Sequence, residues 1–182
     1  MDFGTDGRQR EWLAAFDEVG QIPSRLNTEE VSALAQVLED PGRRWFFTGQ
    51  GRSGLVAAMV AMRFMHLGRV AHFLGEPTAP AVRAGDGLLV ICGSGQTSIS
   101  VSRAARAHGL GLVVASVTHA TSSPLHDTSD LVVIIDSHGS RQLGGSMFEQ
   151  SALLLLDGVI QQLARQLPDA GEGLRLRHAN LE

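Results

Sequence analysis

Apolar residues recur at helical spacing over residues 8–20 and 28–39. This period, with an apolar residue at every third or fourth position, predicts two amphipathic helices. Thr28 is a suitable helix start, and the pair Pro41-Gly42 is a strong stop signal after the second helix. We therefore expect a helical hairpin at the N-terminal end of the chain.

From residue 44 onward, short apolar runs alternate with longer segments of helical period. The runs predict five strands, at residues 44–49, 69–74, 87–92, 110–117 and 130–136. Helices are expected at residues 53–67, 97–108 and 146–167, with one more turn in the polar tail 171–182. Continuous runs of Val, Ile and Leu between helices are typical of a parallel sheet covered on both faces. The sequence thus predicts one α/β domain, with N-terminal helices (1–42), a core (43–167) and a C-terminal tail (168–182).

Length, composition and charge are those of an ordinary globular domain. The 182 residues suffice for one domain, and 43% of them are hydrophobic. The formal net charge of -4 argues against nucleic acid or a membrane surface as a partner, since either would favour a basic excess. The first residues, MDFGTDGRQR, lack the apolar core of a signal peptide, and no apolar run reaches membrane-spanning length. We expect a soluble, cytoplasmic protein.

Two absences exclude several chemistries. All 15 basic residues are Arg, so the chain can form no Schiff base through Lys and carries no P-loop lysine. Cys92 is the only cysteine, which excludes an intramolecular disulfide and a zinc cluster built on Cys. A bound phosphate would have to be held by Arg, hydroxyl groups and backbone N–H groups. We expect neither a metal nor a cofactor.

Ligands of parallel α/β sheets bind beyond the carboxyl ends of the strands. The first predicted strand runs into GQGRSG (49–54), whose glycines match the GxGxxG pattern of dinucleotide-binding folds. Glu76 lies near the place of the ribose-binding acid in that pattern. Alternatively, the glycines serve only a tight turn from strand to helix. The spacing alone does not decide between these interpretations.

The third predicted strand ends in CGSGQTS (92–98), which also leads directly into a helix. Gly93 and Gly95 allow the backbone close to a ligand, and Ser94, Thr97 and Ser98 add hydroxyl groups. Helix N-termini carry free N–H donors and partial positive charge, so this loop predicts an anion site. The alternative is N-capping of the helix by Ser94 or Thr97. Because a dinucleotide fold does not need a second hydroxyl-rich loop, a small phosphorylated ligand explains both loops better.

Six segments along the chain carry a resemblance to a known family. They are GQGRSG (49–54), AMRFMHLG (61–68), GEPTAP (75–80), GSGQT (93–97), GGSMFEQSALLLLDGVI (144–160) and RHANLE (177–182). In these segments the chain resembles the sugar isomerase (SIS) domain family, and within it the isomerases of hexulose phosphates. The resemblance implies a five-stranded parallel sheet in flavodoxin-like order and an oligomer built on dimers, commonly a tetramer. It also implies isomerisation of 3-hexulose 6-phosphate to fructose 6-phosphate without metal or cofactor, with Ser53, Ser94 and Thr97 at the phosphate.

The chain departs from the pattern of that family at two places. Cys92 stands where the second loop usually begins with Ser, so one hydrogen bond to the phosphate is expected to be weaker. Leu143-Gly144-Gly145 replaces the usual Pro-Met-Gly before the last long helix. We expect this change to loosen the loop that positions Glu149.

Moving a carbonyl group between neighbouring carbons of a sugar proceeds most simply through an enediol. The reaction needs a base that takes a proton from carbon, and a second group that moves protons among the oxygens. Without Lys and Tyr, the candidates are Glu, Asp and His. Glu149, at the start of an apolar helix, is the first candidate for the carbon base. The alternative is a capping box, in which Glu149 bonds back to Ser146; the resemblance favours the catalytic role.

His178 and His66 are the candidates for the second group. A chain end such as residues 177–182 is normally mobile, so its match to the family indicates docking, for example into the site of a neighbouring subunit. The alternative for His178 is an exposed tail histidine. The alternative for His66 is a simple interaction with the C-terminus of its own helix.

Gly51, Arg52 and Glu76 complete the predicted substrate contacts. Packing or surface positions are expected for the remaining histidines and for the helical methionines, which are His72, His108, His119, His126, His138, Met59, Met62 and Met65. The predicted function is a cofactor-free isomerase that acts on a small sugar phosphate and forms a homo-oligomer. Open alternatives are an isomerase of another sugar phosphate, a non-catalytic sensor of sugar phosphates and a dinucleotide-binding protein.

Overall fold

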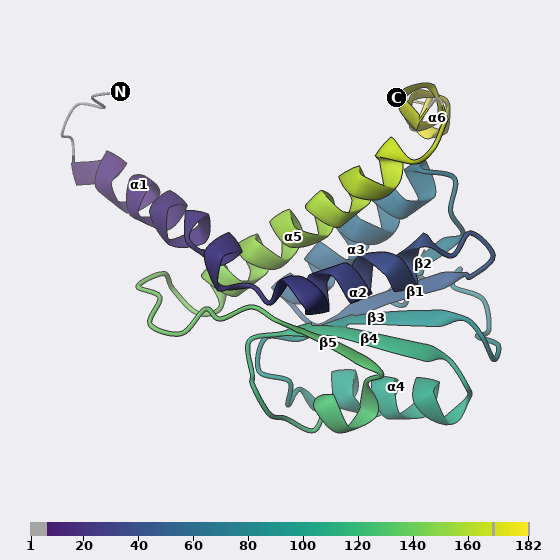
Figure 1. Ribbon diagram of the computed structural model, residues 1–182, viewed down its shortest axis with the longest axis horizontal. Helices are drawn as coiled ribbons and strands as arrows, with labels where there is room; N and C mark the ends of the chain where they lie inside the picture. Colours follow the sequence, from purple (N-terminus) through teal and green to yellow (C-terminus); the bar gives the residue numbers. More distant parts are fainter. Residues whose placement is uncertain (1–6, 169, 182) are drawn as a thin grey trace.

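The five apolar runs form one parallel sheet with the strand order β2-β1-β3-β4-β5, as the resemblance implied (Figure 1). The computed structural model describes residues 7–168 and 170–181. The strands are β1 (Trp45–Gly49), β2 (Ala71–Phe73), β3 (Gly87–Ile91), β4 (Val113–Thr118) and β5 (Leu131–Ile134). Every neighbouring pair is parallel. This is the flavodoxin-like order, whose switch point lies between β1 and β3.

Helices cover both faces of the sheet. They are α1 (Gly7–Gly20), α2 (Thr28–Glu39), α3 (Arg52–His66), α4 (Ser98–Gly109), α5 (Ser146–Arg165) and α6 (Ala170–Arg177), with short 3-10 turns η1 (Ile22–Arg25) and η2 (His126–Thr128). Helices α2, α3 and α5 lie over one face, and α4 lies over the other (Figure 1). The predicted α/β architecture is confirmed. Residues 1–6, Asp169 and Glu182, which the predicted domain also includes, lie outside the described residues.

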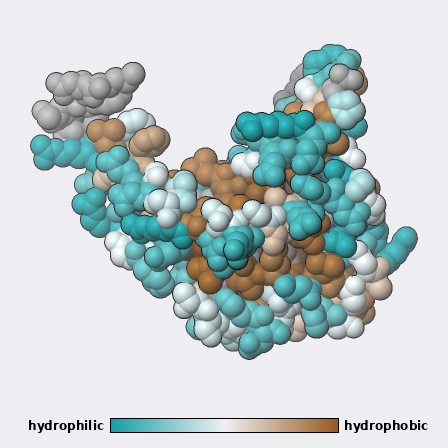
Figure 2. Space-filling model, viewed as in Figure 1, coloured by the Kyte–Doolittle hydropathy of each residue, from teal (hydrophilic) through white to brown (hydrophobic). Residues whose placement is uncertain are grey.

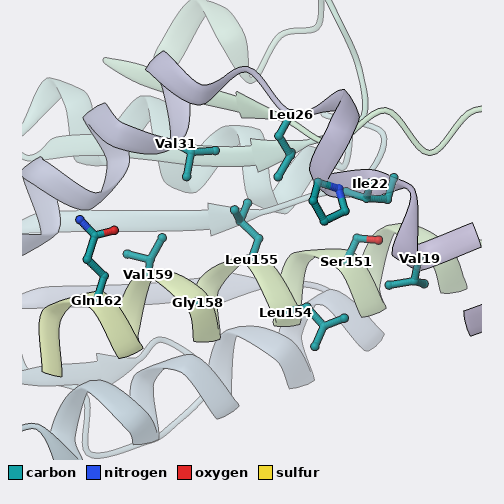
Figure 3. A pocket seen from close by; sticks show the side chains of 11 residues that line it. Val19, Ile22, Leu26, Val31, Ser151, Leu154, Leu155, Gly158, Val159 and Gln162 are labelled. Carbon is teal, nitrogen blue, oxygen red and sulfur yellow. The ribbon is translucent and has the colours of Figure 1, made fainter. Parts of the chain in front are cut away.

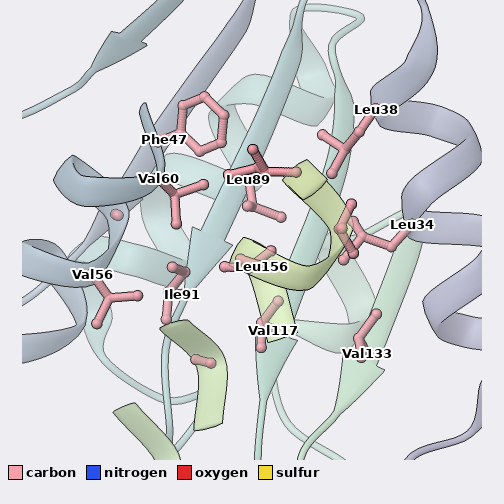
Figure 4. Close-up of a cluster of buried hydrophobic side chains, with 14 of the residues drawn as sticks. Leu34, Leu38, Phe47, Val56, Val60, Leu89, Ile91, Val117, Val133 and Leu156 are labelled. Atoms are coloured by element: carbon pink, nitrogen blue, oxygen red, sulfur yellow. The ribbon is translucent and has the colours of Figure 1, made fainter. Parts of the chain in front are cut away.

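Alternating side chains of the central strands fill an apolar core on each face of the sheet. On one face, Phe47 of β1 and Ile91 of β3 share a core with Val60 of α3 and Leu156 of α5 (Figure 4). On the other face, Phe46 belongs to a smaller core beneath α4. Burying one such side chain contributes roughly 1.5–3 kcal/mol. Because β1 and β3 are buried along their whole length, the loops that follow them start from firmly held positions.

β2 is shorter than the apolar run that predicted it. Only Ala71–Phe73 pair with β1, and the preceding Val70 is half exposed. β2 lies at the edge of the sheet and has a strand on one side only. Fewer of its residues are therefore tied into the hydrogen-bond ladder.

α1 extends away from the sheet as an arm and packs against α5 (Figure 1). The 3-10 turn η1 redirects the chain, so α1 leads away from α2 and the two helices do not form the expected hairpin (Figure 1). Trp12 and Phe16, which the helical period placed on an apolar face, are 64% and 70% exposed. A single chain therefore leaves an apolar strip of α1 in water. Among the described helices, none is long and apolar enough to span a membrane.

Candidate active site

The first loop joins the carboxyl end of β1 to the N-terminus of α3. A Cβ atom at Gly49 would lie 2.6 Å from the carbonyl oxygen of Ser53, so the turn itself requires glycine. Gly51 occupies the N-cap of α3 and has no side chain that could cap the helix, while Ser53 is buried in the first turn. The free N–H groups of this first turn favour an anion. The glycines therefore serve a tight turn from strand to helix. This turn also places the N-terminus of α3 at the switch point of the sheet.

The second loop joins β3 to α4. Gly95 has a φ of +63°, and a Cβ atom there would overlap Ser123 Oγ, so only glycine fits. Thr97 occupies the N-cap of α4, but its side chain makes no capping hydrogen bond within the part of the chain that the structure describes. Ser94 Oγ accepts a hydrogen bond from the N–H of Gln96 at 3.2 Å. Thr97 and Ser98 are exposed to solvent.

The thiol of Cys92 lies where donors of the second loop converge. Burial raises the pKa of this thiol, but hydrogen bonds from the hydroxyl and N–H of Thr97 and from the N–H of Gly95 outweigh it, and the net pKa is lowered. Donors that stabilise a thiolate also stabilise an oxyanion. The electrostatics of Cys92 therefore supports the prediction of an anion site in this loop.

Both loops open into one polar pocket of about 300 Å³, bounded on its far side by the start of α5. It brings together four residues predicted for the site, which are Ser53, Gly93, Ser94 and Glu149. The rest of its lining consists of His119, Ser137, His138, Gly144, Gly145 and Phe148. The pocket thus places hydroxyl groups of both loops beside a carboxylate.

Glu149 is held against the first loop and not by a helix cap. Its Oε2 lies 2.6 Å from Arg52 Nε. The two groups form an ion pair, but the angles between them do not fit a hydrogen bond. Gly145 is the N-cap of α5, and Ser146 Oγ donates instead to the carbonyl oxygen of Leu143 at 2.8 Å. The capping-box alternative is therefore not the observed arrangement. With a side chain only 14% exposed, the carboxylate lies at the wall of the pocket.

Six other predicted contact residues do not line the pocket; they are Gly95, Thr97 and Ser98 of the second loop, and Gly51, Arg52 and Glu76. Arg52 is 60% exposed and borders a neighbouring hollow of about 440 Å³, whose lining also includes Glu149. Gly51 lies in the same first loop. Glu76 follows the carboxyl end of β2 and is exposed to solvent, with its N–H bonded to the carbonyl oxygen of Phe73 at 3.0 Å.

His66 and His178 lie together, at the opposite end of α3 from Arg52. Their rings stack, with centroids 4.7 Å apart and an interplanar angle of 17°. Arg177 Nη1 donates to the carbonyl oxygen of His66 at 3.3 Å, which helps to dock the tail. Burial lowers the pKa of His66, and the nearby positive groups His178 and Arg63 lower it further. Since α3 rises about 1.5 Å per residue, this pair lies roughly 20 Å from the Glu149 end within one chain.

Two histidines that the sequence assigned to packing or surface positions line the pocket instead. His119 and His138 follow the carboxyl ends of β4 and β5, and their rings meet edge to face with centroids 5.1 Å apart. His119 also meets the edge of Phe148, at 6.0 Å between centroids. Their position directly after predicted strands was a usable signal, because ligands bind at that edge of the sheet.

A carboxylate of α1 ties down the loop between β5 and α5. Glu18 Oε2 accepts a hydrogen bond from Ser140 Oγ at 2.7 Å, and Oε1 accepts one from the N–H of Arg141 at 3.1 Å. These hydrogen bonds, with others from the side chains of Gln142 and Arg141, lower the pKa of Glu18 to about 2. This loop carries Gly144 and Gly145 into the pocket lining. Glu18 therefore offsets the freedom that the two adjacent glycines were expected to introduce.

The sheet order and the two glycine-rich loops at its switch point are those of an α/β domain of the sugar isomerase type. The chain belongs to the SIS domain family, whose model matches residues 38–154. It is 44% identical over 174 residues to a 3-hexulose-6-phosphate isomerase of Mycobacterium gastri, covering 91% of this chain and 87% of that one. It is 35% identical over 176 residues to a 3-hexulose-6-phosphate isomerase of Bacillus subtilis, covering 92% and 95%.

A solved structure agrees with these sequence relatives. It is that of a Methanococcus jannaschii protein, for which the crystal structure infers a molecular function of 3-hexulose-6-phosphate isomerase. The TM-score is 0.85 and the sequence identity 28%, with 95% of this chain and 99% of that chain covered. The fold predicted from the resemblance is thereby confirmed over nearly the whole chain.

Proposed function

We propose that this protein is a sugar-phosphate isomerase that interconverts 3-hexulose 6-phosphate and fructose 6-phosphate through an enediol, without a metal or cofactor. The observation that carries the proposal is the single pocket of about 300 Å³ in which both anion loops face Glu149. A phosphate bound at one end leaves the sugar carbons beside the carboxylate. The names of the Mycobacterium gastri and Bacillus subtilis relatives support the same reaction.

The phosphate binds between the N-termini of α3 and α4. Ser53 contributes the first loop, and Ser94 and Thr97 contribute the second, with the N–H group of Gly93 close by. Ser98 adds a hydroxyl in the first turn of α4. Each helix N-terminus contributes partial positive charge and free donors to the dianion. This arrangement explains how a chain without Lys holds a phosphate.

Glu149 is the carbon base in this proposal. Its carboxylate takes the proton from C2 of the 3-hexulose and returns it to C3, while a proton moves from the oxygen at C2 to the oxygen at C3. Arg52 orients the carboxylate through the 2.6 Å ion pair. A positioned general base of this kind contributes typically 10²–10⁴-fold to a rate. Glu76, exposed beyond β2, binds a sugar hydroxyl.

His66 and His178 supply the second group from a neighbouring subunit. Within one chain they lie at the far end of α3, roughly 20 Å from Glu149. If two copies of α3 packed antiparallel about a twofold axis, the His66 end of each helix would lie beside the Arg52 end of the other. Each site would then combine the carboxylate of one chain with the histidines of the next.

The surface of α3 supports this second copy. Leu55, Met59 and Met62 are 67%, 47% and 55% exposed, and their spacing forms an apolar strip along the helix. The strip begins at the hollow that also contains Arg52 and Glu149, so a copy seated on it would border the pocket. We propose that this strip is the interface between two copies of the chain.

A second apolar surface extends the same argument. Figure 2 shows hydrophobic residues gathered in the hollow between the α1 arm and the far end of α5. Beneath it, a groove of about 270 Å³ runs between η1, α2 and α5, with Ile22, Leu26 and Leu155 pointing into it (Figure 3). Trp12 and Phe16 of α1 flank this region, and an apolar partner surface would bury their exposed side chains. A further copy of the chain provides it, giving a dimer of dimers.

A coupled assay tests the proposed reaction. A hexulose-phosphate synthase generates the substrate from ribulose 5-phosphate and formaldehyde, and fructose 6-phosphate is read through phosphoglucose isomerase and glucose-6-phosphate dehydrogenase. We expect turnover without added metal, and a loss of at least about a hundredfold in kcat for Glu149→Gln. The matched control is Asp157→Asn, which removes one carboxylate from the same helix outside the pocket lining and should leave kcat near the wild-type value. Absence of turnover by the folded wild-type protein, or near-normal kcat in Glu149→Gln, would contradict the proposal.

A further inference from the structure

His119 is built into the wall of the pocket at a place where its backbone is fixed. It is the first residue after β4, and its N–H donates to the carbonyl oxygen of Gly93 at 3.0 Å. Its ring lies against the same glycine, because a Cβ atom at Gly93 would be 3.4 Å from His119 Cδ2. His119 is therefore positioned directly by the second anion loop.

The ring of His119 is held from two sides. His138 meets it edge to face at 5.1 Å between centroids, and Phe148 meets it at 6.0 Å. His119 Nδ1 is buried and has no hydrogen-bond partner among the described residues. An N–H at that position would lack an acceptor, so the neutral ring carries its hydrogen on Nε2. With Nδ1 closed off, Nε2–H is the donor that the ring can offer to a ligand in the pocket.

We propose that His119 is a further catalytic residue, whose Nε2–H donates a hydrogen bond to the substrate oxygen that becomes negatively charged in the enediolate. This inference rests on the proposed function. When Glu149 removes the proton from C2, negative charge develops on the oxygen at C3. A fixed donor gains more from the charged oxygen than from the ketone, so it lowers the barrier and leaves substrate binding little changed.

The neighbouring His138 lacks the features that mark His119. It is exposed, it follows β5 at the rim of the pocket, and its loop is held from α1 by Glu18. Its ring supports His119 through the edge contact. His138 therefore supports the ring that carries the donor, from the rim of the pocket.

Substitution by Phe separates the two roles, because it keeps a flat ring and removes the donor. We expect His119→Phe to lower kcat by about 10²–10³-fold with KM changed less than about threefold. The control is His108→Phe, at an exposed histidine on α4, which should leave kcat near the wild-type value. His119→Gln keeps an N–H donor and should recover part of the loss. Thermal unfolding and circular dichroism verify folding, and His119→Leu, which also removes the donor, carries the test if His119→Phe does not fold.

Binding measurements make the test independent of turnover. The probes are inorganic phosphate and a phosphorylated hydroxamate that imitates the enediolate. His119→Phe should weaken the hydroxamate by about the same factor as kcat and leave phosphate affinity unchanged. Equal loss of both probes, or normal kcat in His119→Phe, would overturn the role of His119. Wild-type protein that binds both probes but turns over no hexulose phosphate would overturn the proposed reaction instead.

Discussion

Arg52 Nε lies 2.6 Å from Glu149 Oε2, so the first residue of α3 holds the acidic residue in the first turn of α5. The contact joins the loop after β1 to the helix after β5. These two elements meet because parallel strands place all their carboxyl ends at one edge of the sheet. The ion pair thus orients the carboxylate of Glu149, for which a capping box with Ser146 was the alternative interpretation.

Loss of Arg52 should impair turnover more than stability. Arg52 is largely exposed, so Arg52→Ala should change the free energy of unfolding by less than about 1 kcal/mol. Glu149 loses its orienting partner, and we expect kcat to fall by about tenfold to a hundredfold. Steady-state kinetics and urea unfolding check both parts. Arg52→Lys, which keeps the charge, should recover activity partly; equal activity of Arg52→Ala and wild type would remove the positioning role.

Glu18 makes the stability of the protein dependent on pH in the acidic range. Its pKa is lowered from 4.5 to about 2 by the hydrogen bonds from Ser140, Arg141 and Gln142. A lowered pKa in the folded state stabilises the protein above pH 4.5, and this contribution is lost as the pH falls toward 2. Glu18→Gln should therefore be less stable than wild type at pH 7, and the difference should shrink at pH 2.5. Urea unfolding at the two pH values measures it.

The control for Glu18→Gln is Asp17→Asn, the exposed neighbour on α1. It removes the same charge without touching the loop, so it should not reproduce the pH dependence. Hydrogen exchange gives a second readout, because loosening of the loop should speed exchange at the N–H of Arg141, which bonds to Glu18. A constant stability difference from pH 7 to 2.5 would show that Glu18 does not hold the loop through its charge.

Acid should weaken the docking of the tail on α3. Burial lowers the pKa of His66, and the positive charges of His178 and Arg63 lower it further. For a histidine with a lowered pKa, the stabilisation is complete above the ordinary value of about 6.5 and is lost as the pH falls below it. Arg177, which donates to the carbonyl oxygen of His66, adds another positive charge nearby. When both histidines are protonated, two positively charged rings stacked with centroids 4.7 Å apart repel each other.

Histidine NMR titration measures this coupling directly. We expect His66 to titrate below 6.5, and His178→Asn to raise its pKa by removing one of the positive neighbours. His108→Asn, a change at an exposed histidine on α4, is the control and should leave the His66 titration unchanged. A pKa of His66 at or above 6.5 in the wild type would contradict its burial beside positively charged neighbours.

Local patterns were enough to predict most of the fold. The buried strands β1 and β3 follow from continuous apolar runs, and the helices follow from their period, because both depend on neighbours in sequence. The sheet order came from the family resemblance and not from periodicity. The second anion loop was predictable from its glycines and hydroxyl groups, since strand end and helix start are adjacent in the chain.

The parts of the site that depend on distant contacts were not predictable. The place of His119 after a predicted strand was a usable signal, but its contact with Gly93 depends on β4 lying beside β3. Glu18 reaches Ser140 across the molecule, which no local pattern encodes. Glu149 matched both a capping box and a catalytic role, and the structure removes the first because Gly145 is the N-cap and Ser146 Oγ donates to Leu143. These contacts depend on how elements pack, which composition and spacing do not specify.

Mixing two inactive variants tests whether each site draws on two chains. In the proposed assembly, Glu149→Gln and His178→Asn damage the same site from different subunits. A mixed dimer then contains one site with both substitutions and one site with neither, by its twofold symmetry. After unfolding and refolding together at equal amounts, the mixture should recover roughly a quarter of wild-type activity. Refolding each variant alone is the control and should recover none. No recovery in a mixture that forms mixed dimers, shown by native mass spectrometry, would mean that the histidines do not reach the partner's Glu149.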